Sequence, residues 1–359
     1  ATAAELLQHF DFGWNDPATL RRFRDKFALK RWVRHADRGV RVPECRLIRS
    51  PQDIFGTPLP DRFVIKPNDG FGNQNVGIFR REARPEILAH LLKRPGIDWI
   101  LEEYVDGTEF HIDGQVRRNG EVTVLGVMEY SREDVNGCAT VYRGERQCRT
   151  THPLFATLRD YAERLLRATG LRRCPFHLEV KVDERGPCLV DVGARLASEG
   201  GGDQLSRMHP DRPDAFAVAA HDYLFEGDFA MQPLDWRHYD SELLVLVYGL
   251  STAPGIIKTL DGVEQVEAMP EFVNWAVKPR IGDSLRPTRS LSEAPYIVEL
   301  RHKGSHEDSE RLMDKVRATV RWNRRPAAKA WVNAYATALL RRAPPKLSWL
   351  AHRLEQPIL

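Results

Sequence analysis

The sequence predicts an α+β fold of two or three subdomains, and three stretches carry most of that prediction. Residues 63–79 read FVIKPNDGFGNQNVGIF, in which two apolar runs flank a loop rich in Gly and Asn. Residues 176–195 read FHLEVKVDERGPCLVDVGAR, the pattern of a β-hairpin with one acidic residue on each strand. Residues 100–110 read ILEEYVDGTEF, a strand that runs into a polar bend.

Length and composition set the broad class. The chain has 359 residues, with 42% hydrophobic and 29% charged residues, as in an ordinary globular protein. No apolar stretch of about 18 residues predicts a transmembrane segment, and no signal-peptide pattern is visible. The net charge of +3 is too small to indicate nucleic-acid binding. We therefore expect a cytoplasmic protein without a nucleic-acid partner.

The cysteines give no sign of a structural framework. The chain contains 5 of them, scattered along the sequence and without a CxxC pair. We interpret them as free thiols in a reducing compartment rather than as disulfides or a structural zinc site.

We divide the chain into five segments. An N-terminal helical segment and linker is followed by a small lid, a larger central unit, a unit that completes the larger side, and a basic helical tail. Their bounds are residues 1–58, 59–104, 105–230, 231–325 and 326–359. The tail would either bind an anionic partner or a membrane surface, or dock on its own domain.

Residues 131–152 differ from their surroundings because they show no clear period. They contain glycine, two cysteines and several charges, which is typical of a mobile loop. We expect this loop to line or cover a substrate. His152 at its end would either contribute there or be an ordinary loop histidine before a proline.

The loop in residues 63–79 predicts an anion site. Gly70, Gly72 and Gly77 let the backbone turn sharply, so that its N–H groups can converge on one anion. Lys66 at the edge of the loop would add a point charge for a phosphate oxygen. The alternative is a plain hairpin turn with a surface lysine.

The hairpin in residues 176–195 predicts a pair of facing carboxylates. A loop formed by residues 184–186 would place Glu179 directly opposite Asp191. At about 4 Å and an effective dielectric constant near 20, their repulsion is roughly 4 kcal/mol. A divalent cation would offset it, and oxygen ligands favour Mg²⁺ or Mn²⁺. The alternative is that Lys181, Arg195 or solvent screens the charges.

The same register makes the other face of this hairpin apolar, which specifies the pairing strongly. His177 would face that apolar side or lie beside it, where packing is as reasonable a role as catalysis. The register would set Leu178, Val180 and Val182 opposite Val192, Val190 and Cys188.

The stretch 100–110 has the composition of a purine-binding segment. The irregular backbone after the strand would offer free N–H and C=O groups to a purine edge, and Glu109 could accept hydrogen bonds from ribose hydroxyls. The alternative is a strand end with solvated acids.

In their order along the chain, these motifs resemble the ATP-grasp superfamily, and within it the carboxylate–amine ligases of the L-amino-acid ligase and carnosine synthase branch. The resemblance covers residues 25–203 motif by motif and residues 240–325 more loosely. It implies an ATP-grasp fold in which residues 59–104 form the lid and residues 105–230 the central catalytic subdomain, with the nucleotide clamped between them.

The resemblance also assigns roles to individual residues. It implies that Lys66 and Arg195 act in phosphoryl transfer and that residues 70–77 cover the phosphates. ATP would be bound by Lys26, Lys66, Gly70, Gly72, Glu102, Glu103, Val105 and Glu109, and Mg²⁺ by Glu179 and Asp191.

Three departures from the family pattern accompany the resemblance. The second metal ligand is usually Glu, and Asp191 is one methylene shorter. An Asn often follows two residues later, where this chain has Gly193. These enzymes usually also carry a leading domain before the helix that begins at residue 25, and this chain has only a short segment there. We expect that the domain is truncated, lost or supplied by a companion chain.

The implied activity is an ATP-dependent, amide-forming ligation of a small acid with an amino acid or amine, through an acyl phosphate and with release of ADP and phosphate. Residues 199–203 would lie near the acid, and a homodimer is common in such enzymes. Two alternatives remain: a kinase of the same fold that phosphorylates a small hydroxyl compound, and a non-catalytic nucleotide-binding or scaffold module.

Overall fold

The computed structural model describes residues 15–56, 58–70, 75–197, 215–224 and 236–325, together with Glu5 and His9. Several expectations concern residues outside these ranges. They are residues 71–74 of the predicted phosphate-covering loop (which include Gly72), the stretch 199–203, and the basic tail 326–359.

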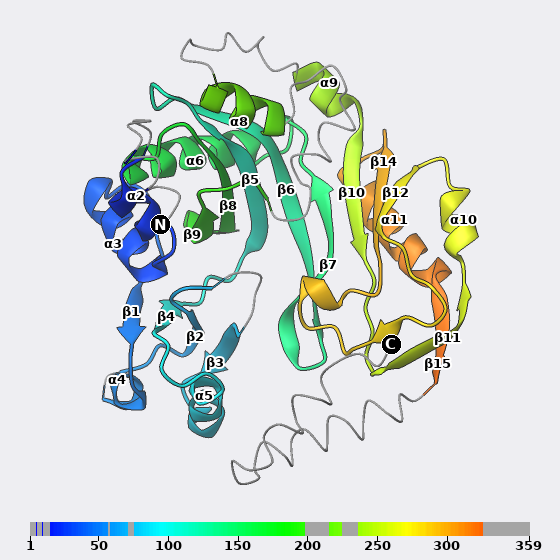
Figure 1. The fold of residues 1–359 in the computed structure, drawn as a ribbon, viewed down its shortest axis with the longest axis horizontal. Helices are drawn as coiled ribbons and strands as arrows, with labels where there is room; N and C mark the ends of the chain where they lie inside the picture. The colour runs from blue at the N-terminus through cyan, green and yellow to red at the C-terminus, as the bar shows by residue number, and fades with distance from the viewer. Residues whose placement is uncertain are drawn as a thin grey trace.

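A small antiparallel sheet forms the lid, drawn at the lower left in Figure 1. Alternate residues of its strands, among them Phe63 and Ile65, are fully buried against Ile87 and Leu91 of the lid helix α5. The first strand comes from the segment that we assigned to the N-terminal linker. In sheet order the strands are β1 (Cys45–Ile48), β4 (Trp99–Glu103), β2 (Arg62–Pro67) and β3 (Gly77–Arg80), and the helices are α4 (Pro51–Phe55) and α5 (Arg84–Leu91).

An eight-stranded sheet forms the body of the molecule, and every strand pair described in it is antiparallel. It joins strands from both sides of our boundary at residue 230. In sheet order they are β12 (Phe272–Val277), β14 (Ile297–His302), β10 (Leu243–Tyr248), β7 (Cys138–Gln147), β6 (Val122–Val135), β5 (Thr108–Val116), β8 (Cys174–Asp183) and β9 (Gly186–Gly193).

The register of β8 and β9 confirms one prediction and corrects another. Glu179 is paired with Asp191, as the sequence predicts. Beyond that pair a β-bulge intervenes, so Val180 lies opposite Leu189 rather than Val190. The turn is correspondingly tighter, with Gly186 at φ 93° paired with Asp183. Our assumed loop of residues 184–186 was one residue too long.

Residues 131–152 are mostly strand rather than the mobile loop that we expected. Strands β6 and β7 form a long hairpin that turns at Asn136 and Gly137, both of which have positive φ, 56° and 69°. Asn and Gly are the residues that tolerate this left-handed conformation best. The residues showed no clear period because both faces of this hairpin carry polar side chains within the protein.

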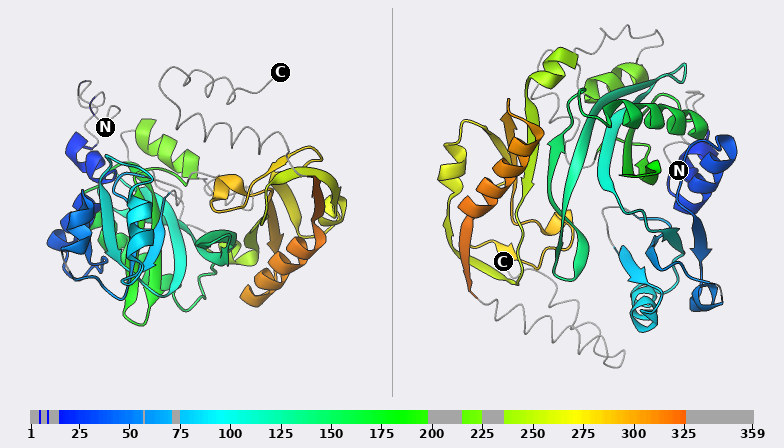
Figure 2. Two further views of the ribbon diagram at one scale, coloured as in Figure 1. Left: turned by 90° about the horizontal axis from the view of Figure 1, so that it is seen from below. Right: turned by 180° about the vertical axis from the view of Figure 1, so that it is seen from behind.

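Two helices cover one face of the large sheet and leave the other face polar. The helices α3 (Lys26–Ala36) and α6 (Phe155–Thr169) enclose the main core together with β5, β6 and β8, and α2 (Pro17–Arg22) lies beside them (Figure 2). Helix α3 starts at Lys26 because the side chain of Asp25 accepts a hydrogen bond from the Ala28 N–H. Its first side chain, that of Lys26, reaches the polar side.

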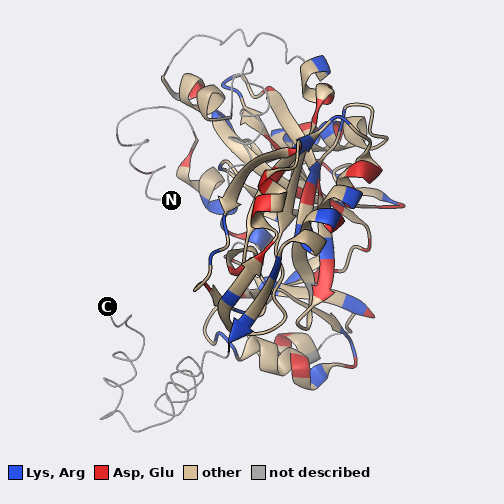
Figure 3. Ribbon diagram, turned by 90° about the vertical axis from the view of Figure 1, so that its right-hand side faces the viewer, with Lys and Arg blue, Asp and Glu red and all other residues tan. Residues whose placement is uncertain are grey.

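The C-terminal part of the described chain extends the large sheet. Helix α11 (His306–Thr319) packs Leu312, Met313 and Val316 on β10 and β14. Strand β15 (Arg321–Arg325) follows this helix. It joins β11 (Gly255–Asp261) and β13 (Ser284–Leu285) in a three-stranded sheet. Acidic and basic residues are interspersed along the ribbon on this side (Figure 3).

The remaining described helices are short. They are α8 (Ala215–Leu224), α9 (Trp236–Ser241), α10 (Val263–Glu267) and the 3₁₀ helix η1 (Leu291–Glu293). Among the described residues, no helix combines the length and apolar character needed to cross a membrane. All 5 cysteines are free thiols, as predicted.

Candidate active site

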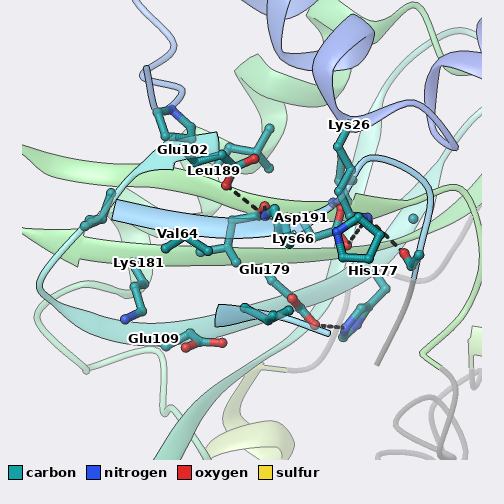
Figure 4. A pocket seen from close by; sticks show the side chains of 18 of the residues that line it. Lys26, Val64, Lys66, Glu102, Glu109, His177, Glu179, Lys181, Leu189 and Asp191 are labelled. Carbon is teal, nitrogen blue, oxygen red and sulfur yellow. Dashed lines mark hydrogen bonds and ion pairs between the residues drawn. The ribbon is translucent and has the colours of Figure 1, made fainter. Parts of the chain in front are cut away.

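A cavity of about 490 Å³ lies between the lid sheet and the polar face of the large sheet (Figure 4). Within the described part of the chain, all the residues predicted to bind ATP or Mg²⁺ or to act in phosphoryl transfer line it. They are Lys26, Lys66, Gly70, Glu102, Glu103, Val105, Glu109, Glu179, Asp191 and Arg195.

Lys26 connects three parts of this site. Its Nζ lies 2.8 Å from Oδ2 of Asp191 and 3.0 Å from the carbonyl oxygen of Gly70. The lysine side chain is 9% exposed and that of Asp191 is 30% exposed. One ammonium group therefore joins helix α3, strand β9 and the base of the glycine-rich loop.

A buried ion cluster holds Lys66. Its Nζ lies 2.9 Å from Oε2 of Glu102, whose Oε1 lies 2.8 Å from Nζ of Lys30. Both lysines also donate to the carbonyl oxygen of Val190, at 2.9 and 3.1 Å. The sequence analysis missed Lys30, although it stands one helical turn after Lys26 and therefore on the same face of α3.

The bulge in β9 explains how Val190 reaches these lysines. The extra residue interrupts the ladder between Asp191 and Leu189, so the Val190 carbonyl is turned toward the two ammonium groups. Sequence alternation alone does not reveal a bulge, because it assumes a period of two throughout the strand.

Burial and charge pairing act differently on the members of the lysine–glutamate cluster. Burial alone would lower the pKa of Lys66, but the carboxylates of Glu102 and Asp191 raise it above the ordinary value. For Lys30, burial prevails and the pKa is lowered. Burial would raise the pKa of Glu102, yet the two lysines hold it below its usual range.

Glu179 stands at one end of a chain of buried polar side chains. Its Oε1 lies 3.4 Å from Nε2 of His177, whose Nδ1 lies 2.8 Å from Oδ1 of Asp113. His177 and Glu179 share the polar face because they are two residues apart on β8. Of the two placements that we expected for His177, on the apolar side or beside it, the first is therefore wrong.

The chain continues across the sheet toward β10. Oδ2 of Asp113 lies 2.7 Å from Nδ1 of His111, and Nε2 of His111 lies 3.1 Å from Oε2 of Glu145. The hydroxyl of Tyr248 donates to Oε1 of Glu145 at 2.5 Å. Burial alone would lower the pKa of each histidine, but Asp113 together with Glu145 or Glu179 raises it, to about 9 for His111 and about 10 for His177.

Glu109, the predicted ribose ligand, is held by a buried arginine. Its Oε1 accepts a hydrogen bond from Arg132, whose guanidinium lies 3.6 Å from the ring centroid of Tyr142. Arg132 also donates to the carbonyl oxygen of Thr140 at 2.9 Å. The sequence analysis missed Arg132 because it placed this residue in a mobile loop.

The first residues of the predicted purine segment already contact other protein groups. The carboxylate of Glu102 is taken by the lysine cluster, and the N–H of Glu103 donates to the carbonyl oxygen of Glu44 at 2.8 Å. The side chain of Glu103 pairs with Arg185. Residues 104–107, which include the buried Val105, connect β4 to β5 outside the ladders.

Two further expectations have different outcomes. Arg195 follows β9 at the cavity, where it is exposed and donates to the carbonyl oxygen of Leu196 at 2.8 Å. His152 contacts Phe110 and His306, and Phe110 belongs to the main core on the other face of the sheet. His152 therefore does not line the cavity.

The donor set suits the divalent cation that the carboxylate pair predicts. Glu179 and Asp191 are cross-strand neighbours, and their oxygens are the ligand type that Mg²⁺ and Mn²⁺ prefer. Within the described residues, Oε2 of Glu179 has no hydrogen-bond partner, whereas His177 orients Oε1. Outer-shell hydrogen bonds of this kind commonly orient metal ligands.

Comparison with known proteins assigns the fold. Residues 59–203 match the ATP-grasp domain family. A solved structure, that of the L-amino acid ligase from Bacillus licheniformis, superposes with a TM-score of 0.71 at 17% sequence identity and covers 90% of this chain and 78% of that chain. The chain therefore contains an ATP-grasp domain and has the ATP-grasp fold.

Two curated relatives are similar in sequence. An uncharacterized protein of Sinorhizobium fredii is 26% identical over 345 residues, which cover 91% of this chain and 66% of that protein. Dapdiamide A synthase of Enterobacter agglomerans is 27% identical over 251 residues, which cover 66% of this chain and 56% of that protein. The chain thus spans less than two thirds of the length of either relative.

Proposed function

We propose that the chain acts as an ATP-dependent carboxylate–amine ligase that forms an amide bond between a small acid and an amino acid or amine. The observation that carries this proposal is the single cavity lined by lysines and carboxylates from both the lid and the large sheet. The similarity to dapdiamide A synthase and to an L-amino acid ligase supports it.

The proposed reaction has two steps. A carboxylate oxygen of the acid attacks the γ-phosphorus of ATP, and the bond to the bridging oxygen breaks, which yields ADP and an acyl phosphate. The amine nitrogen then attacks the acyl carbon, phosphate leaves with its oxygen, and the nitrogen loses a proton. Such phosphoryl transfer depends mainly on positioning and charge neutralisation.

The residues of the cavity would share this work. Lys26 and Lys66 would hold the phosphates, because each ammonium already lies inside the cavity on a rigid element. Arg195 would stabilise the charge that develops on the transferred group. Mg²⁺ held by Glu179 and Asp191 would neutralise charge between the phosphates. The lid would exclude water, which would otherwise hydrolyse the acyl phosphate.

The nucleoside would lie farther along the cavity. Residues 104–107 would meet the purine edge, and Glu109 would accept hydrogen bonds from the ribose hydroxyls. Its contact with Arg132 keeps the carboxylate of Glu109 in place before the nucleotide binds.

The first experiment measures ADP and phosphate release with ATP, Mg²⁺ and a panel of acid and amine pairs. We expect both products only when a suitable acid and amine are present together. Lys66→Ala and Glu179→Gln should each lower turnover by at least about 100-fold, because charge-stabilising groups at reacting phosphates are worth this much.

Matched controls test whether the losses are local. Lys93→Ala removes an exposed lysine from the lid, and Glu184→Gln changes an exposed acid in the β8–β9 turn, so both should keep full activity. Circular dichroism should show all four variants folded. Full ATP consumption by Lys66→Ala or Glu179→Gln would refute the assignment, and ADP formation without free phosphate would indicate a kinase instead.

A further inference from the structure

Lys26 occupies an unusual position for a residue whose predicted partner is a phosphate. Its ammonium lies on Oδ2 of Asp191, which is a predicted metal ligand, at 2.8 Å. The same ammonium donates to the carbonyl oxygen of Gly70, at the base of the glycine-rich loop, at 3.0 Å. The ammonium of a predicted phosphate ligand thus neutralises the carboxylate of a predicted metal ligand.

Hydrogen bonds to Asn68 hold the backbone at the start of helix α3, which carries Lys26. The N–H of Lys26 donates to the carbonyl oxygen of Asn68, and the N–H of Phe27 donates to Oδ1 of Asn68 at 2.9 Å. Helix α3 is therefore anchored to the lid strand's exit, and only the lysine side chain can move between Asp191 and a ligand in the cavity.

Asp191 cannot readily serve a metal ion while Lys26 holds it. Its Oδ1 accepts a hydrogen bond from the Val192 N–H at 3.0 Å, and its Oδ2 is taken by the ammonium. A divalent cation and an ammonium on one carboxylate repel each other. Additional negative charge in the cavity would offset that repulsion. A triphosphate brings that charge and offers the ammonium a new partner.

We propose that Lys26 is an exchangeable counterion that opposes metal binding at Asp191 until a nucleotide draws it away. The inference rests on the proposed function and concerns how the two ligands bind. The metal alone would bind weakly, and the metal and nucleotide would strengthen each other's binding reciprocally. Futile occupancy of the site by free metal would thereby be suppressed.

Lys66 provides an internal contrast. It is held by Glu102 and by the Val190 carbonyl, and neither of these is a predicted metal ligand. Removal of Lys66 should therefore weaken nucleotide binding. It should strengthen the binding of free metal less than removal of Lys26 does.

The test measures the binding of Mn²⁺ by electron paramagnetic resonance, with and without ADP, to the wild type and to a set of variants. Lys26→Met removes the counterion, Lys26→Arg keeps its charge, and Arg31→Met removes an exposed positive charge from the same helix. Without ADP, we expect Lys26→Met to bind Mn²⁺ at least roughly fivefold more tightly than the wild type, because fivefold is the upper range for an exposed ion pair and the Lys26–Asp191 pair is largely buried.

The control variants show whether the neutral charge at residue 26 causes the effect. Lys26→Arg and Arg31→Met should bind free Mn²⁺ as weakly as the wild type does, and ADP should tighten Mn²⁺ binding more in the wild type than in Lys26→Met. Thermal unfolding checks that each variant is folded, and Lys26→Gln serves as a second neutral variant.

Two failures are distinguishable. If the wild type binds Mn²⁺ with ADP but both neutral variants bind free Mn²⁺ no more tightly than the wild type, the counterion inference is wrong and the ligase proposal stands. An equal gain in Arg31→Met would also overturn the inference, because it would indicate a general charge effect. If the wild type binds no Mn²⁺ with ADP, the proposed function itself fails.

Discussion

Lys30 shows how much of this site is built from residues that need never touch a ligand. Its side chain is 1% exposed, and its ammonium shares Glu102 and the Val190 carbonyl with Lys66. The cluster holds the lid strand β4 against helix α3 and the bulge in β9. It thereby fixes the direction of Lys66 before any phosphate enters the cavity.

Lys30→Met should therefore destabilise the protein. Removal of one partner from a buried ion pair costs about 3 kcal/mol or more, and Lys66 would only partly compensate the charge of Glu102. Urea unfolding measures the change. Arg34→Met on the same helix breaks an exposed contact with Glu44 and should cost less than about 1 kcal/mol. Equal losses in the two variants would contradict the structural role of Lys30.

His111 should make stability depend on pH. Asp113 and Glu145 face its two nitrogens, His177 and Tyr130 lie beside its ring, and the carboxylates raise its pKa from 6.5 to about 9. Because the folded state holds the proton more tightly, this stabilisation is complete below about pH 6.5 and is lost as the pH rises through about 9.

The measurement is urea unfolding of His111→Gln and wild type at several pH values. The wild type should lose stability between about pH 6.5 and 9, and the variant should be less stable at low pH and show a flatter profile. His35→Gln, at an exposed position of α3, should keep the wild-type slope. An unchanged slope in His111→Gln would show that this histidine is not charged in the folded protein.

At the scale of elements, the motifs whose geometry follows from local pattern were predictable. Alternation of apolar residues placed Glu179 opposite Asp191, because one face of that hairpin is buried. The bulge at Val190 was not predictable, since both alternatives bury equally apolar residues. The hairpin of β6 and β7 was missed because its polar side chains are paired within the sheet, as Arg132 is with Glu109 of β5 and Arg146 is with Glu129.

The connection between lid and large sheet depends on a close backbone approach at Gly107. A Cβ atom there would lie 2.1 Å from the carbonyl oxygen of Val182. Gly107→Ala should therefore force β5 and β8 apart and destabilise the protein by about 1–3 kcal/mol, the usual cost of overpacking.

Thermal and urea unfolding test this prediction, with Gly56→Ala in the lid as control. At Gly56 the added Cβ would meet only the carbonyl oxygen of Gln52, at 3.1 Å, and φ is −82°. The control should be nearly neutral. A Gly107→Ala protein as stable as the control would show that the two strands can separate at little cost.

At the scale of the whole molecule, one sheet joins parts of the chain that we divided at residue 230. Strand β10 pairs with β7, and Tyr248 on β10 ends the polar chain that starts at Glu179. The lid is a separate sheet, and the cavity lies between the two. The cavity therefore has Lys66 on the lid and the carboxylates of Glu179 and Asp191 on the large sheet.

The central claim is that the two paired carboxylates and the two cavity lysines hold one metal–nucleotide complex. A crystal structure with Mg²⁺ and a non-hydrolysable ATP analogue tests it most directly. We expect Mg²⁺ at about 2.1 Å from an oxygen of both Glu179 and Asp191, with the phosphates in contact with Lys26 and Lys66. A nucleotide bound elsewhere, or a metal ion that contacts neither carboxylate, would contradict the account.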